Sequence, residues 1–231
     1  MFLHKLGLVT FALLMAPPML FAAAKPHSAV LGAIKKVPYS IEGDPAGARP
    51  DEKELHVRPL VVDGKVKEWT TGDAHDVTDR SFAVRRAVRL NDALPGDKAD
   101  HWVWQRGPWL LIDRTSGHVI ALRLPDYDPA VSEVVWFRDY AAYCGLNAGG
   151  KHLYAVVAQM AARKPLLAKK LADWNPVDHA PEPCQPAVWQ RDPLRVVFHP
   201  AGAAESSFNL VGSSAVLVED GDEDPAPPKA P

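Results

Sequence analysis

Long apolar runs, which a transmembrane helix requires, are nearly absent from this chain. The one such run extends from Leu6 to Phe21, follows Lys5 and contains Pro17 and Pro18. It holds about 16 residues, whereas a transmembrane helix needs roughly 20. We therefore expect no transmembrane segment in the mature chain.

The same run fits a secretory signal peptide. A basic residue precedes it, and Ala22, Ala23 and Ala24 supply the small residues of a cleavage site before Lys25. We expect residues 1–24 to be removed and the mature protein to be periplasmic or secreted. Both compartments stay open, because the organism decides between them.

An excess of charge of one sign is also lacking. The chain carries 26 Lys and Arg against 28 Asp and Glu, a formal net charge of −2. The acidic excess comes from a proline-rich tail over residues 219–231, whose composition predicts disorder. Because no basic field would attract phosphates, we expect no nucleic-acid partner. The partner predicted instead is an envelope or extracellular ligand or protein.

Cysteine is scarce, with Cys144 and Cys184 as the only two. In an oxidising compartment an isolated pair most often closes one disulfide. A free buried thiol and a redox pair are the alternatives, but the spacing is not Cys-x-x-Cys. We expect a structural disulfide between Cys144 and Cys184.

Sequence motifs that identify a catalytic or cofactor-binding site are missing as well. The chain has no Gly-x-Ser-x-Gly, no His-Glu-x-x-His, no phosphate-binding loop and no Gly-x-Gly-x-x-Gly. We therefore expect no cofactor, and the sequence names no catalytic residue. Whether the protein is an enzyme stays open at this point.

The chain does contain many short segments with the residue pattern of β-strands. Residues 25–54 form a proline-rich leader, predicted to be extended with one short strand near Val37–Ile41, and residues 55–218 are predicted to form a single β-rich domain. The clearest hairpin joins His56–Val62 to Lys65–Trp69 through Asp63-Gly64, the dipeptide that a type I′ turn favours. Pro59 has no amide hydrogen, so its strand is predicted at a sheet edge, or to begin just after Pro59.

Later segments predict further strands and one helix. Alternation over Phe82–Leu90 favours a strand, although Arg86 breaks the apolar face and leaves a helix open. Pro165–Trp174 is predicted as a short helix, because Leu167, Leu171 and Trp174 have helical spacing. Short final strands are predicted at Val188–Trp189, Arg195–His199, Phe208–Val211 and Ala215–Val218.

The stretch Trp109–Gln159 contains four consecutive strand patterns. Trp109–Asp113 turns at Gly117 into His118–Leu124, and Val131–Tyr143 is followed across a Gly-rich turn by His152–Gln159. This stretch resembles one blade of a β-propeller, and the resemblance implies a shape without an activity. No second copy follows, so a complete propeller is not expected.

These patterns together predict a mostly β fold. Its parts would be antiparallel hairpins, a four-stranded blade-like meander, at most one short helix and disordered ends.

Two clusters are candidate ligand sites. Asp73, His75, Asp76 and Asp79 could converge on a divalent cation, although a turn capped by Asp and Thr side chains is the simpler interpretation. Trp102 and Trp104 share a face if they lie in a strand, and Trp109 follows closely. Such a face could stack on sugars or prolines, with core packing as the alternative.

Charged residues give two weaker candidates. Asp126 and Asp128 lie in one loop and could perform acid/base chemistry on glycosides, though loop aspartates usually form turns. A basic concentration at Arg80, Arg85, Arg86 and Arg89 could bind an acidic partner, and local pairing with the preceding aspartates is the simpler explanation.

We therefore expect an exported, non-enzymatic binding or structural module of the cell envelope or the secreted space. The alternative is a secreted hydrolase, with or without a metal, that uses Asp73, Asp76, Asp126 or Asp128.

Overall fold

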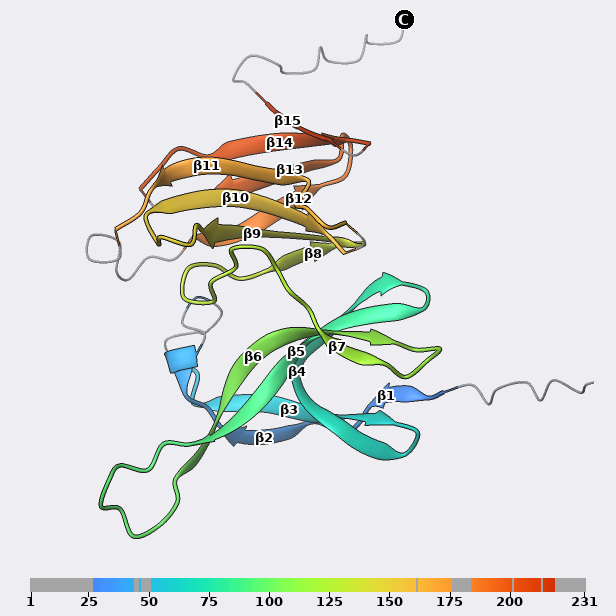
Figure 1. Cartoon of the computed structure of the whole chain (residues 1–231), viewed down its shortest axis with the longest axis vertical. Helices are drawn as coiled ribbons and strands as arrows, with labels where there is room; N and C mark the ends of the chain where they lie inside the picture. Colours follow the sequence, from blue (N-terminus) through green and yellow to red (C-terminus); the bar gives the residue numbers. More distant parts are fainter. Residues whose placement is uncertain are drawn as a thin grey trace, which may run out of the picture.

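The fold consists of three antiparallel sheets (Figure 1). The computed structural model describes residues 27–43, 46, 51–160, 162–175, 184–200, 202–212 and 214–218. The predicted signal peptide and acidic tail lie outside these residues. The described part contains no α-helix, so the prediction of a mostly β fold is confirmed. Within this part no helix is long and apolar enough to cross a bilayer.

The first sheet, sheet A, has seven strands and occupies one end of the molecule (Figure 1). They are β1 (Ala29–Leu31), β2 (Lys35–Pro38), β3 (Glu54–Val62), β4 (Lys65–Thr78), β5 (Ser81–Asn91), β6 (Trp102–Asp113) and β7 (Val119–Ala121). Asp63 and Gly64 both have positive φ angles, 51° and 76°, as the predicted type I′ hairpin requires. The leader contributes β1 and β2 instead of the one strand predicted near Val37–Ile41, and Ile41–Gly43 forms a short 3-10 helix, η1. Phe82–Leu90 lies within β5, a strand as favoured.

The prediction that the strand of Pro59 lies at an edge is wrong. β3 lies between β4 on one side and β1 and β2 on the other. Opposite Pro59 the flanking strand is interrupted, because β1 ends at Leu31 and β2 begins at Lys35. The Pro59 carbonyl accepts a hydrogen bond from Gly32 N at 2.8 Å, on the side where the proline nitrogen has no hydrogen to donate. A gap in the neighbouring strand therefore accommodates the proline as an edge would.

The other two sheets have four strands each and stack at the opposite end (Figure 1). Sheet B contains β8 (Val135–Phe137), β9 (Tyr140–Leu146), β10 (His152–Gln159) and β11 (Leu167–Asp173). Sheet C contains β12 (Gln185–Gln190), β13 (Arg195–His199), β14 (Ser206–Val211) and β15 (Ser214–Leu217), which agrees with the predicted final strands.

The helix predicted over Pro165–Trp174 is wrong, because this segment forms the edge strand β11. Leu167 pairs with Val157 of β10, and the register shifts opposite Leu153 and Tyr154, which leaves Leu171 as the extra residue of a bulge. A helix of ten residues is marginal in water. Pairing with β10 satisfies the backbone and also packs Leu167 and Leu171 on the core.

The four strands of the blade-like stretch do not form one sheet. β6 and β7 pair in sheet A, whereas β8, β9 and β10 pair in sheet B. The molecule does contain four-stranded meanders, but they run from β8 to β11 and from β12 to β15. Local alternation predicts strands without specifying which strands share a sheet. The assignment of residues 55–218 to one domain stays a prediction.

Sheet B is covered on both faces. Ala142 and Cys144 of β9 join the core between sheets B and C, while the alternate residues Ala141 and Tyr143 face sheet A. β10 is divided in the same way. The second face belongs to a set of side chains that we call the junction cluster: Val134, Ala141, Tyr143, Val156 and Ala158, with Trp109, Leu124, Tyr127, Trp136, Tyr154 and Met160 packed against them.

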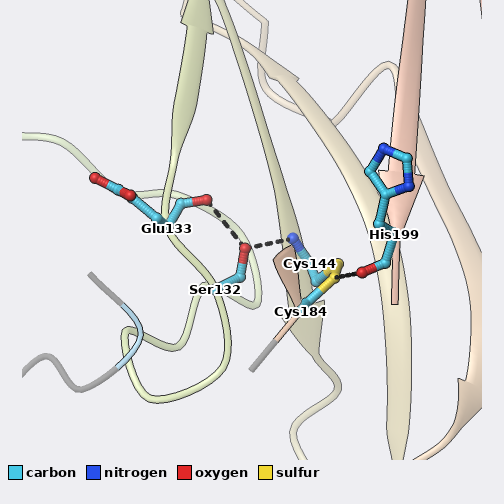
Figure 2. Close-up of a disulfide and its surroundings, with 5 residues drawn as sticks. All are labelled: Ser132, Glu133, Cys144, Cys184 and His199. Atoms are coloured by element: carbon cyan, nitrogen blue, oxygen red, sulfur yellow. Dashed lines mark hydrogen bonds between the residues drawn. A yellow bond between two sulfur atoms is a disulfide. The ribbon is translucent and has the colours of Figure 1, made fainter. Parts of the chain in front are cut away.

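The predicted disulfide between Cys144 and Cys184 is confirmed, and it links sheets B and C (Figure 2). Cys144 lies in β9 and Cys184 directly precedes β12; both are buried, with their Cα atoms 6.3 Å apart. The neighbouring segment is fixed to both cysteines: Cys144 N donates to Ser132 Oγ at 3.0 Å, and Cys184 N donates to the Val131 carbonyl at 2.8 Å. The cross-link therefore also holds the chain that leads to Glu133.

Candidate functional site

A cleft of about 420 Å³ lies where sheet A meets sheet B. Residues 71–75 of β4, Arg85 of β5, and Arg106 and Trp109 of β6 form its sheet A side. Glu133 and Trp136 close it from the side of sheet B. We call this the aromatic cleft. Its volume is in the range of small-molecule sites, and it lies between two packed units, where such sites often occur.

Arg85 is the buried cation of the aromatic cleft, with a relative exposure of 6%. Its Nη1 donates to Tyr127 Oη at 2.7 Å, and its guanidinium carbon lies 5.7 Å from the Trp109 ring centroid and 5.5 Å from that of Tyr127. A guanidinium between two aromatic rings is oriented by cation–π attraction. Arg85 thus presents a planar donor group at a fixed place.

Tyr127 and Tyr143 connect the two sheets beside the cleft. Tyr127 bonds to Arg85 of sheet A and packs edge-to-face on Tyr143 of sheet B, with centroids 5.3 Å apart. Tyr143 Oη donates to the Pro125 carbonyl at 2.7 Å, and burial raises the pKa of the Tyr143 phenol. Because the phenol stays protonated, this hydrogen bond persists across the physiological range.

A close backbone approach fixes the loop that carries Tyr127. Leu146 N donates to the Asp126 carbonyl at 2.8 Å, and Tyr127 forms an isolated bridge with Gly145. A Cβ at Gly145 would lie 2.8 Å from the Asp126 carbonyl oxygen. Glycine is required at this position for the loop to reach sheet B.

Aromatic rings form one wall of the cleft. Trp109 packs edge-to-face on Trp136 at 5.2 Å, and the imidazole of His75 stacks on Trp136 at 5.4 Å with an interplanar angle of 22°. His75 Nε2 lies 2.6 Å from the Arg138 carbonyl, which identifies Nε2 as the protonated nitrogen. The indole nitrogens of Trp109 and Trp136 are buried and have no hydrogen-bond partner among the described residues. A buried donor of this kind costs about 1–3 kcal/mol, so an acceptor that reaches it is favoured.

Arg106, which also lines the cleft, is fixed by protein partners. Its Nη2 donates to both carboxylate oxygens of Glu52 at 2.8 and 2.9 Å, and its Nη1 donates to Tyr39 Oη at 2.7 Å. The aromatic cleft therefore contains both signs of charge, from Arg85 and Arg106 and from Asp73 and Glu133. This arrangement suits a polar ligand with donors and acceptors better than a simple anion.

The predicted metal residues do not come together. Asp73 and His75 line the aromatic cleft, whereas Asp76 accepts from Arg114 Nη2 at 2.6 Å and Asp79 lies in the turn after β4. Among the described residues no group of three or more His, Cys, Asp or Glu is arranged to hold a metal ion. Metal binding at this segment stays a prediction without a cluster to support it. We expected a turn here in which side chains cap backbone amides. Such a cap occurs at the end of the segment, where Arg80 N donates to Thr78 Oγ1 at 3.2 Å.

The three predicted tryptophans have different surroundings. Trp102 is 41% exposed and lies under the guanidinium of Arg89, 4.2 Å from the ring centroid. Trp104 packs edge-to-face on Trp69 in a small cluster of sheet A. Only Trp109 lines the aromatic cleft, because Trp102 and Trp104 lie farther along β6, opposite Asn91 and Arg89. The three therefore do not form one stacking face.

The loop carboxylates form turns. Asp128 Oδ1 accepts from Ala130 N at 2.8 Å, and Asp126 has a positive φ of 56°. Neither lines the aromatic cleft with Asp73.

The arginines do not pair with the preceding aspartates as expected. Arg86 pairs with Glu68, Arg89 covers Trp102, and Arg80 Nε donates to Thr115 Oγ1. Long-range packing in the sheet has replaced local pairing.

The sequence analysis missed Arg106, Tyr127, Glu133 and Trp136 as site residues. They come from β6, the inter-sheet loop and β8, and they meet only because sheet B folds over sheet A. The one local signal in the sequence was Arg85. It is a charged residue that alternates along the strand with two buried alanines, Ala83 and Ala87.

Comparison of the chain with family models, with curated proteins and with solved structures finds no match.

Proposed function

We propose that the protein is exported and acts as a non-enzymatic binding module of the cell envelope or the secreted space, with the aromatic cleft as its ligand site. The observation that carries the proposal is the position of a buried arginine, Arg85, between aromatic rings in a cleft between two sheets. Burying a charge is costly unless the surroundings hold it. Such a group in a cleft suggests a binding role.

The chemistry of the cleft suits a saccharide. Charged groups of both signs can bond to hydroxyls, and the tryptophan rings offer apolar faces for the ring of a sugar. No pair of the proposed catalytic carboxylates shares the cleft, since Asp73 alone of the four lines it. Glu133 is a second carboxylate in the cleft, so the purified protein must also be assayed for hydrolysis to separate binding from turnover.

Export rests on two observations of the chain. One is the signal-like segment, a basic residue followed by the apolar run and three alanines. The other is the disulfide, a bond that persists in oxidising compartments. N-terminal sequencing of the protein secreted by a host cell should begin at Lys25.

The test is titration with chitotetraose and maltotetraose, followed by tryptophan fluorescence. Asp73→Ala should weaken binding of the preferred saccharide about tenfold, because one charged hydrogen-bonding group is lost. Asp79→Ala is the matched control, since this exposed carboxylate lies in the turn after β4 and should leave affinity unchanged. Equal affinity in both variants would place the ligand elsewhere. Hydrolysis of either saccharide by the purified protein would favour the hydrolase.

A further inference from the structure

A second cleft, of about 270 Å³, lies between the edge of sheet A and the β10–β11 hairpin. On one side it is lined by Leu111 of β6, by residues 120–123 and by Pro125; on the other by residues 158–160 and 162–165. We call it the basic cleft. The junction cluster separates it from the aromatic cleft, because Trp109 and Trp136 line one and Ala158 and Met160 line the other.

The charge of this cleft has one sign. Arg123, Arg163 and Lys164 line it, and none of the described lining residues is Asp or Glu. None of these three side chains forms a salt bridge or a side-chain hydrogen bond within the described part of the chain. This distinguishes them from Arg85, Arg86, Arg106 and Arg114, which all have side-chain partners. Three uncompensated cations around one hollow create a positive local potential.

The rest of the lining is apolar. Leu111, Leu122 and Met160 are half-buried, and Ile120, in the edge strand β7, is 56% exposed. Among the described residues that line the cleft, Gln159 alone has an uncharged polar side chain, and its Nε2 already donates to Asp139 at 2.9 Å. An apolar floor with a cationic rim matches a ligand that has an acidic group on a hydrocarbon body.

We propose that the basic cleft binds a single-chain anionic amphiphile, with the head group at Arg123, Arg163 and Lys164 and the chain on Ile120, Leu122 and Met160. The head is a carboxylate, as in a fatty acid, or a phosphate, as in a phospholipid with one chain. The site is independent of the aromatic cleft, so Asp73→Ala should leave this binding unchanged.

Calorimetric titration of the purified protein with decyl phosphate and with decanoate, both below their micellar concentrations, tests the proposal. Both should bind, and the tighter of the two identifies the head group. Octyl phosphate should bind about 15-fold more weakly than decyl phosphate, because two methylenes are no longer buried. Ile120→Ser should weaken the binding of both ligands. Because Ile120 is exposed, this substitution should not impair folding.

A charge-matched pair of variants tests the head group. Arg123→Gln, Arg163→Gln and Lys164→Gln together should weaken decyl phosphate at least tenfold, since the charge-assisted hydrogen bonds are lost. Lys65→Gln, Lys98→Gln and Lys169→Gln remove the same net charge from exposed positions outside the cleft and should change little. Equal loss in both triple variants would overturn the proposal.

Two further probes separate other sources of the same anion. Inorganic phosphate that binds as tightly as decyl phosphate would overturn the role of the chain. Cosedimentation with vesicles of anionic phospholipid, without binding of either monomeric amphiphile, would also overturn the proposal and identify the patch as a membrane contact.

Discussion

The half of the molecule built from sheets B and C differs from sheet A in how its core is made. Its main cluster has 13 buried residues and includes the disulfide. Sheet A has two smaller clusters, of six and three buried residues. Most of the aromatic cleft belongs to sheet A, whereas Glu133 and Trp136 are held by the cross-linked half. The comparison indicates that the half with the larger, cross-linked core holds one wall of the cleft and that sheet A provides most of its lining side chains.

Among the changes that test this comparison, removal of the disulfide should have the largest effect on the free energy of unfolding. Replacing both Cys144 and Cys184 with alanine should lower the free energy of unfolding by about 3–4 kcal/mol, because the cross-link closes a loop of 40 residues. Urea denaturation measures the loss. If residues 55–218 are one cooperative domain, native-state hydrogen exchange should show the loss in β3–β6 as well. A loss confined to β8–β15 would mean that the halves unfold independently.

Two adjacent arginines test the junction between the halves. Arg85→Leu should cost about 2–3 kcal/mol, because it removes a buried charged group that bonds to Tyr127 across the junction. Arg86→Leu should cost less than about 1 kcal/mol, because its bond to Glu68 lies near the surface, where its side chain is 42% exposed. Denaturant curves of both variants check the order. A larger loss for Arg86→Leu would contradict the assigned role of Arg85.

The fold could be predicted from sequence where local chemistry decides it. Asp63-Gly64 specifies its turn, alternation favours a strand at β5, and two cysteines allow only one pairing. The segment 165–174 could not be assigned, because its spacing suits a helix and only pairing with β10 makes it a strand.

The candidate site was less predictable than the fold. Trp109 was named, but its partners Arg85, Glu133 and Trp136 are up to 51 residues apart in sequence and meet only after the sheets pack. Proximity in sequence instead grouped Trp102, Trp104 and Trp109, of which only Trp109 lines the cleft.

A smaller effect is expected from one hydroxyl at the junction. Tyr143→Phe should lower the free energy of unfolding by about 1 kcal/mol, because the Pro125 carbonyl loses its donor. Tyr140→Phe is the control, since the Tyr140 hydroxyl has no hydrogen bond within the described residues. Thermal denaturation of the two variants side by side gives the difference. Equal melting temperatures would show that the Tyr143 bond contributes nothing.

The smallest effect concerns pH and the β6–β7 turn. Ser116 N and Thr115 N donate to Asp113 Oδ1 at 2.9 and 2.7 Å, and these bonds lower the pKa of Asp113 below its usual 3.8. The carboxylate therefore contributes stability above pH 3.8, which is lost as the pH falls through the lowered pKa. Asp113→Asn should flatten the acid limb of the stability curve slightly. An acid limb identical to that of the wild type in Asp113→Asn would rule out the linkage.

The most direct measurement for the central claim follows the seven indole N–H resonances of the protein during titration with the preferred tetrasaccharide. If the ligand occupies the aromatic cleft, the signals of Trp109 and Trp136 should shift, while those of Trp69, Trp102 and Trp104 stay in place. Shifts confined to Trp102 or Trp104, or the absence of shifts at Trp109 and Trp136 in a protein that binds the saccharide, would contradict the account.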